Sequence, residues 1–125
     1  MPASILVVDD DSLVRWSLAQ HLSQHGFEVA TAATGAEALA RARSAPVPRL
    51  VVLDLKLPDM DGLALLAALR HQLASVPVIV LSAHLTPEMV VRLHDASVTQ
   101  VVEKPFQLDA LLELARRCLA EPTRA

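Results

Sequence analysis

Residues 5–11 read Ile5-Leu6-Val7-Val8-Asp9-Asp10-Asp11, an apolar run that stops abruptly at three carboxylates. A short aliphatic run bounded by polar residues is typical of a strand that is buried on both faces of a sheet. Three more runs follow the same plan: Leu50 to Leu53 ends at Asp54, Val78 to Leu81 ends at Ser82, and Val101-Val102 leads through Glu103 to Lys104-Pro105. If these strands are parallel in one sheet, their terminal side chains gather at its carboxyl edge, where open α/β sheets bind ligands.

Helical patterns separate these runs. Ser12 is a candidate cap for a first helix that stops at Gly26, Thr34 and Glu37 have the spacing of a capping box, and Thr86-Pro87 opens a helix that runs to about Ala96. Further helices are expected over Leu63 to Leu73 and Leu108 to Leu119, and a further strand over Phe27 to Thr31. Five strands alternating with five helices predict an α/β fold, a doubly wound parallel sheet with right-handed crossovers.

Size and composition favour one domain. The chain has 125 residues, of which 53% are hydrophobic and 2% aromatic, so the core must be aliphatic. A formal charge of −3 gives no general attraction to nucleic acid or to an anionic membrane. The single cysteine, Cys118, excludes an internal disulfide and suits the cytoplasm. We expect one domain over residues 1–125, with a core from about 4 to 119 and a frayed tail over 121–125.

The residues at the strand ends form a set that can handle a phosphoryl group. Asp9, Asp10 and Asp54 would repel one another unless one is protonated or a cation binds, and their hard oxygens suit Mg²⁺. Lys104 could neutralise a phosphoryl oxygen, and the Ser82 hydroxyl could donate a hydrogen bond to it. Each residue alone is weak evidence, because polar residues commonly fill turns at strand ends. Their joint placement predicts a site that moves a phosphoryl group onto a carboxylate.

On these residues the chain resembles the receiver domains of two-component response regulators, from about Ser4 to Leu119. The resemblance implies a flavodoxin-like fold with strand order 2-1-3-4-5. It also implies that Asp54 is the phosphorylated residue, followed by the turn Leu57-Pro58-Asp59-Met60-Asp61-Gly62. The stretch Val8 to Ser12, with Arg15-Trp16, resembles nitrogen-regulation-type receivers in particular.

The resemblance assigns the remaining site residues. Mg²⁺ would be bound by Asp9, Asp10, Asp54 and the backbone carbonyl of Lys56. Ser82 and Lys104 would contact the phosphoryl group, and a cis peptide bond is expected between Lys104 and Pro105.

The resemblance also implies partners. The phosphoryl group would come from a sensor histidine kinase or a histidine phosphotransfer protein, and the chain would catalyse only its own phosphorylation and dephosphorylation. Its fourth helix, fifth strand and fifth helix would face an output domain, a partner protein or a second copy of the chain. No direct contact with nucleic acid or a membrane is expected.

Two positions depart from the family pattern. Val101 stands where the family has a switching Tyr or Phe, and Ser97-Val98 stands where it has Gly-Ala. Valine has no ring to turn and a single χ angle. We therefore expect phosphorylation to move the loop from His84 to Pro87 and the helix that follows it.

Three alternatives stay open at this stage. Val8-Asp9-Asp10-Asp11 also fits the opening of haloacid-dehalogenase-type phosphatases, although these enzymes usually need a cap region that so short a chain lacks room for. A flavin-binding module on the same fold would want a Ser/Thr/Gly-rich phosphate loop after the first strand, where this chain has aspartates that repel phosphate. The third alternative is a receiver-like module that signals by binding alone.

The five histidines show no pattern of a metal site. His21, His25, His71 and His94 lie in helical patterns and are expected to be solvated. His84 follows Ser82 at the rim of the predicted site, where a surface role is the preferred interpretation.

Overall fold

The computed structural model describes residues 3–96 and 98–120. The predicted alternation is confirmed, and predicted element ends agree with the structure to within two residues. Ser97 and the predicted frayed tail over 121–125 lie outside the described residues. In chain order the elements are β1 (Ser4–Val8), α1 (Ser12–Gln24), β2 (Glu28–Ala32), α2 (Gly35–Arg43), β3 (Leu50–Asp54), α3 (Gly62–Gln72), β4 (Val78–Ser82), α4 (Pro87–Asp95), β5 (Gln100–Glu103) and α5 (Leu108–Ala120).

The five strands form one parallel sheet in the order β2-β1-β3-β4-β5, which confirms the predicted flavodoxin-like topology. The register pairs Val8 with Leu53, Asp54 with Leu81, and Ser82 with Glu103. The parallel strands therefore all finish at the same edge of the sheet. This edge receives the polar residues that follow the strands.

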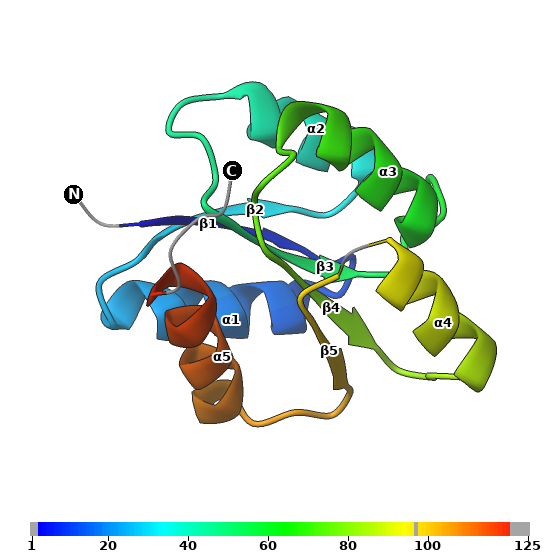
Figure 1. Cartoon of the computed structure of the whole chain (residues 1–125). Coiled ribbons are helices and arrows are strands. Elements are labelled where there is room, and N and C mark those ends of the chain that lie inside the picture. The colour runs from blue at the N-terminus through cyan, green and yellow to red at the C-terminus, as the bar shows by residue number, and fades with distance from the viewer. Residues whose placement is uncertain (1–2, 97, 121–125) are drawn as a thin grey trace.

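The helices cover both faces of the sheet, so its three central strands are buried (Figure 1). Alternate residues of each strand face opposite layers, as the period of a strand requires. One core cluster joins Leu6, Val51 and Val80 to α2, α3 and Leu93 of α4. The other joins Ile5, Val52 and Ile79 to α1 and α5, with Cys118 packed against it.

The first helix is capped by a different residue from the one predicted. Asp11 is the N-cap, and its carboxylate accepts the backbone N–H groups of Leu13 at 2.9 Å and Val14 at 3.4 Å. The prediction of Ser12 was wrong because a carboxylate both caps the helix and complements its positive N-terminal dipole. The third aspartate of the acidic run thus has a structural role. Gly26, at φ +92°, follows the end of this helix as predicted.

The loop after β3 is tied to its neighbours on both sides. The carboxylate of Asp59 accepts the N–H groups of Gly35 at 2.8 Å and Ala36 at 3.0 Å, so it caps α2 from another part of the chain. These two hydrogen bonds lower the pKa of Asp59. Gly62 packs so closely on the backbone of Leu55 that a β-carbon would lie 2.5 Å from the Leu55 Cα. The loop that follows Asp54 is therefore held in one conformation.

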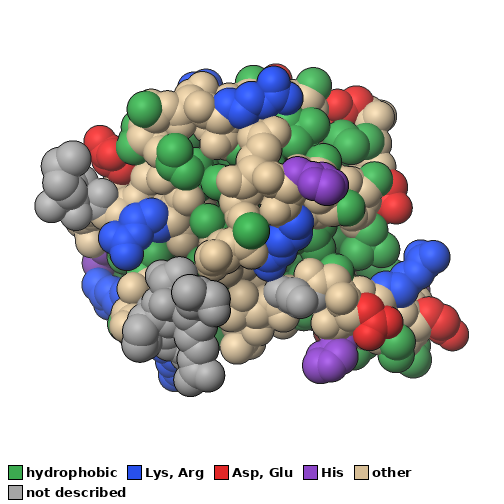
Figure 2. Space-filling view, turned by 45° about the horizontal axis from the view of Figure 1, so that its top comes forward, with side chains coloured by type: hydrophobic (Ala, Val, Ile, Leu, Met, Phe, Trp, Pro, Cys, Tyr) green, Lys and Arg blue, Asp and Glu red, His purple; other side chains and the backbone are tan. Residues whose placement is uncertain are grey.

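None of the described helices is both long and apolar enough to cross a membrane. On the face shown in Figure 2, acidic and basic side chains of the described residues are interspersed with apolar and neutral ones. Charge of one sign does not dominate the described part of this face.

We expect Gly62→Ala to lower the free energy of unfolding by about 1–3 kcal/mol, because the added methyl group collides with rigid backbone rather than with a flexible side chain. Urea unfolding would measure the change. Ala64→Ser, at an exposed position of the same helix, is the control and should stay within about 0.5 kcal/mol of the parent. A Gly62→Ala variant as stable as the parent would show that the backbone near Leu55 can shift to accommodate the methyl group.

Candidate functional site

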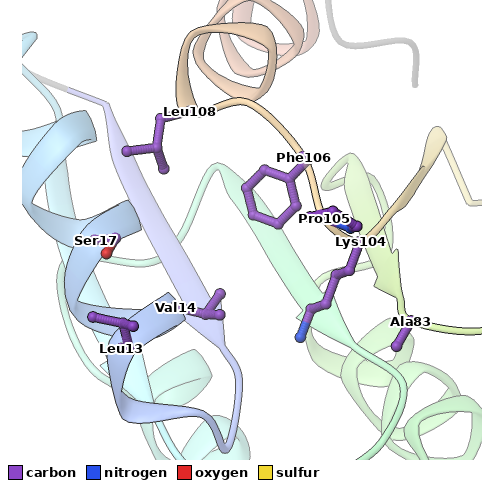
Figure 3. A pocket seen from close by; sticks show the side chains of 8 residues that line it. All are labelled: Leu13, Val14, Ser17, Ala83, Lys104, Pro105, Phe106 and Leu108. Carbon is purple, nitrogen blue, oxygen red and sulfur yellow. The ribbon is translucent and has the colours of Figure 1, made fainter.

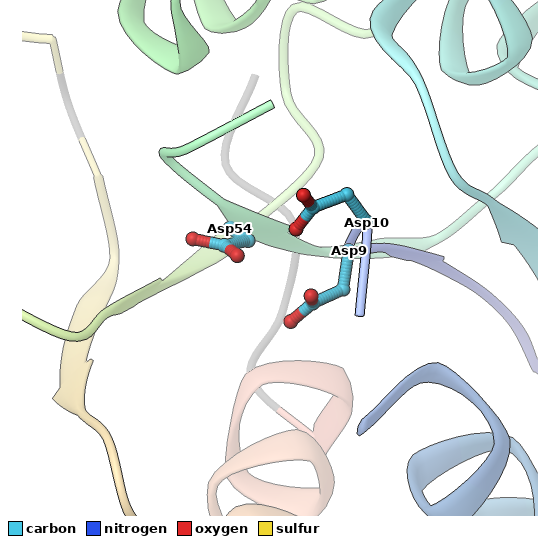
Figure 4. A group of neighbouring side chains, drawn as sticks. All are labelled: Asp9, Asp10 and Asp54. Atoms are coloured by element: carbon cyan, nitrogen blue, oxygen red, sulfur yellow. The ribbon is translucent and has the colours of Figure 1, made fainter. Parts of the chain in front are cut away.

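Three carboxylates meet where β1 and β3 end. Asp9 and Asp10 follow β1, Asp54 ends β3, and one oxygen from each lies within 4.8 Å of the others (Figure 4). Asp9 is 0% exposed and Asp54 is 5% exposed, whereas Asp10 is open to solvent. The sheet register brings these residues together although 45 positions separate the two strand ends, taken as Asp9 and Asp54. Three carboxylates held this close, two of them buried, destabilise the folded protein unless positive charge lies close to them.

Lys104 supplies that charge from the end of β5. Its Nζ donates to Asp9 Oδ2 at 2.9 Å and to Asp54 Oδ2 at 3.0 Å. The Lys104 backbone N–H donates to the carbonyl of Ser82 at 2.8 Å, which fixes the lysine against β4. The peptide bond between Lys104 and Pro105 is cis. One ammonium group therefore bridges two buried carboxylates that belong to different strands.

Burial and pairing oppose each other in this cluster. Burial raises the pKa of Asp9, and it does so despite the hydrogen bonds from Lys104 and from the Asp11 N–H; the negative charge of Asp54 adds to the rise. Burial alone would lower the pKa of Lys104, but its hydrogen bonds to Asp9 and Asp54 outweigh burial, so the pKa is raised. Lys104 thus remains charged at neutral pH, while Asp9 holds its charge less readily than an exposed aspartate.

Backbone groups and one arginine fix the carboxylates further. Asp9 Oδ1 accepts the Asp11 N–H at 2.9 Å, and Asp54 Oδ1 accepts the Lys56 N–H at 3.1 Å. Arg15 reaches back from α1 and donates to the Asp9 carbonyl at 2.8 Å. Sequence reasoning noted Arg15 only as part of a resemblance, because nothing in the chain indicated which backbone group it would hold.

A cleft of about 830 Å³ opens over the cluster. Asp10, Asp54, Lys56, Ser82, His84 and Lys104 are among the residues that line it. The Ser82 side chain is buried, and its hydroxyl oxygen accepts the N–H of His84 at 3.3 Å. The structure thus brings together the predicted acceptor, acidic pair, hydroxyl and lysine. Val101 instead lies half-buried against the core cluster on the α2, α3 and α4 side of the sheet.

Helix α4 contributes two cleft residues that sequence reasoning missed, Met89 and Arg92. Their spacing of three shows that they share a helix face. The sequence does not reveal that this face turns toward the strand ends, because the position of α4 depends on tertiary packing and the helix buries one side chain, Leu93.

The histidines behave as expected with one exception. His25, His71, His84 and His94 are exposed. His21 is half-buried, and its Nε2 lies 2.9 Å from Asp109 Oδ1 across the gap between α1 and α5. The expectation that His21 is solvated was wrong, because the approach of α5 to α1 is a tertiary contact.

An apolar groove of about 510 Å³ lies beside the cleft (Figure 3). Leu13 and Val14 of α1 stand on one side of it, and Phe106 and Leu108 stand on the other. Leu13 is 68% exposed although it is apolar. Lys104 also lines this groove, so the groove and the cleft meet at the bridging ammonium group.

The donor set fits a divalent cation. All three side chains offer hard carboxylate oxygens, their ligand atoms already converge, and the open side of Asp10 leaves room for water molecules, which Mg²⁺ retains when it binds to proteins. Among the described residues, Asp54 is the one buried carboxylate that also lines the cleft.

Residues 5–116 match the response regulator receiver domain family. This chain is a receiver domain. The match favours the receiver over the phosphatase and flavin alternatives. Homologous response regulators and solved receiver structures place the chain in two-component signalling.

The receiver is similar to the transcriptional regulatory protein KdpE of Mycobacterium tuberculosis, with 41% identity over 97% of this chain and 53% of KdpE. It is also similar to the DNA-binding transcriptional regulator NtrC of Escherichia coli, with 34% identity over 93% of this chain and 24% of NtrC. The chain therefore spans about half the length of the first relative and about a quarter of the second.

Among solved structures, a CheY-like response regulator receiver domain protein from Methanospirillum hungatei has a TM-score of 0.90 and 32% identity. The alignment covers 95% of this chain and 94% of that one.

We expect Lys104→Met to lower the free energy of unfolding by about 3 kcal/mol at pH 7 without divalent cations, because two buried carboxylates lose their shared ammonium group. The loss should shrink as the pH falls toward 5, since protonation of Asp9, whose pKa is already raised, removes one of the charges. Urea unfolding at both pH values would measure this, with the exposed Lys56→Met as a control. Equal stability of Lys104→Met and the parent at pH 7 would contradict the bridging role.

Proposed function

We propose that this receiver accepts a phosphoryl group on Asp54 and that the modification changes how it binds a partner. The observation that carries the proposal is the buried Asp54 carboxylate, which is open to the cleft, 3.0 Å from Lys104 and surrounded by converging carboxylates. Burial of Asp9 and Asp54 side by side is unfavourable for folding, and a bound cation and phosphoryl group would give the arrangement a chemical use.

In the proposed transfer, an Asp54 oxygen attacks the phosphorus atom of a phosphohistidine on the donor protein. A new O–P bond forms while the P–N bond breaks, and its electron pair stays on the imidazole nitrogen, which can then take a proton from water. Lys104 moves with the charge, from a carboxylate oxygen to a phosphoryl oxygen. The Ser82 hydroxyl then turns to donate to another phosphoryl oxygen. Catalysis consists of positioning and of charge stabilisation by these groups.

Hydrolysis of phosphorylated Asp54 also forms one bond to phosphorus as another breaks. Water attacks phosphorus, the P–O bond to Asp54 breaks, and inorganic phosphate leaves with the carboxylate restored. When bound at Asp9, Asp10, Asp54 and the Lys56 carbonyl, Mg²⁺ would offset the negative charge of the transferring group.

We further propose that the phosphodonor is a histidine kinase or a histidine phosphotransfer protein acting in the cytoplasm. The apolar groove between α1 and the segment from Phe106 to Leu108 supports this, because it borders the cleft at Lys104. A donor helix that covers exposed Leu13 would bring its histidine toward Asp54. Output would use the surface of α4, β5 and α5, toward an output domain, another protein or a second copy.

Acetyl phosphate with Mg²⁺ should add the mass of one phosphoryl group to the parent protein, because a small phosphodonor can enter the open cleft. Intact-mass spectrometry should show this adduct in the parent and in Asp59→Asn, whose carboxylate caps α2 outside the cleft. Asp54→Asn should carry none. If Asp54→Asn is labelled as fully as the parent, Asp54 is not the acceptor.

Calorimetric titration should detect Mg²⁺ binding that weakens by about tenfold or more in Asp10→Asn, because a site with few protein ligands depends on each carboxylate. Asp11→Asn is the matched control: it changes the neighbouring carboxylate, and asparagine also caps helices, so affinity should stay close to that of the parent. Equal loss in both variants would point to general charge rather than to a defined site.

A further inference from the structure

Phosphorylation of Asp54 would place a new dianion in the cleft, and the cleft holds few cations to meet it. Among its described lining residues, the Lys and Arg side chains are Lys56, Lys104 and Arg92. Lys104 bridges Asp9 and Asp54, and the proposed transfer assigns it to one phosphoryl oxygen, which leaves the other phosphoryl oxygens without a basic side chain from this set. Lys56 lies two positions after Asp54 in the same segment of the chain. A contact from Lys56 to the phosphoryl group would therefore not link Asp54 to another helix or strand.

Arg92 differs from both lysines in where it is attached. It projects from α4, it lines the same cleft as Asp54, and Met89, one turn earlier on the same face of the helix, lines the cleft with it. Within the described residues the Arg92 guanidinium group makes no hydrogen bond or ion pair. It is exposed and can reorient. Its charge is thus available to an anion that appears on Asp54.

Helix α4 is also the helix held least firmly by the core. Leu93 is its one buried side chain, whereas α3 and α5 each bury three or more residues. Val90 and Val91 are exposed, and their β-branched side chains lower the intrinsic preference of this segment for a helix. In Figure 1, α4 stands at the outer side of the molecule, past β4 and β5. A modest pull on this helix can shift it without disrupting the sheet.

The side chain at position 101 is poorly suited to transmit the signal, which is consistent with transmission through α4. Val101 is half-buried in the core cluster and has no ring that could swing between two sites. A signal that depends on side chain 101 would need a larger change than one χ rotation of valine provides.

We propose that Arg92 is the residue through which α4 senses the phosphoryl group. On phosphorylation its planar guanidinium fork binds two phosphoryl oxygens across the cleft, in the bidentate geometry that arginine favours for phosphate. This contact ties α4 to the modified Asp54 and changes the surface that α4 offers to a partner. The inference rests on Asp54 being the proposed acceptor.

Hydrogen–deuterium exchange of the α4 amides, with and without Mg²⁺ and beryllofluoride as the phosphoryl mimic, tests the assignment. In the parent, the mimic should slow α4 exchange by about fivefold or more, because a charge-assisted contact now anchors a loosely held helix. Arg92→Gln should lose most of this slowing, and Arg92→Lys, which keeps the charge but not the fork, should retain part of it. Arg117→Gln, an exposed change on α5, should respond like the parent.

The comparison is made at full occupancy of the mimic in each variant, measured by fluorine NMR. A mimic bound at Asp54 with the same slowing of α4 exchange in Arg92→Gln as in the parent would overturn this inference and leave the proposed function standing. Failure of the parent to bind the mimic at Asp54 would overturn the proposed function and this inference together.

Discussion

Two carboxylates buried at the carboxyl edge of a parallel sheet need positive charge beside them, and a single ammonium group provides it. Asp9 and Asp54 end separate strands, and Lys104 follows a third, yet its Nζ lies 2.9 Å and 3.0 Å from their oxygens. Only the parallel register of β1, β3, β4 and β5 makes this possible. The fold and the site therefore depend on each other, because the strands place the charges and Lys104 offsets the cost of burying them.

The helices differ in how firmly the core holds them. The helices α1, α2, α3 and α5 each bury two or more residues, and the loop after Asp54 is fixed by Asp59 and Gly62. Helix α4 buries Leu93 alone. Asp54 therefore lies between the firmly held cluster at the sheet edge and helix α4, which fewer buried side chains hold in place. In the proposed mechanism, this asymmetry is what would let a small chemical change at Asp54 produce a larger structural response.

The sequence predicted the parts that local pattern controls. Aliphatic runs ending at Asp9, Asp54 and Ser82 specified both the strands and the edge where the site lies, because every strand in a parallel sheet ends on the same side. The miss at Ser12 arose because both it and Asp11 are acceptable caps. The contacts of Arg15 and His21, and the position of Arg92 at the cleft, depend on how helices approach other elements, which a single sequence does not encode locally.

A crystal structure with Mg²⁺ and beryllofluoride would test the central claim, that the cluster around Lys104 is built to hold a phosphoryl group on Asp54. The account predicts beryllium bonded to an Asp54 oxygen and the Lys104 Nζ within hydrogen-bond distance of a fluorine atom. It also predicts that the Ser82 hydroxyl donates to a second fluorine atom and that Mg²⁺ lies against Asp9 and Asp10. Density for the mimic elsewhere, or Lys104 still bridging Asp9 and Asp54 with the mimic bound, would contradict it.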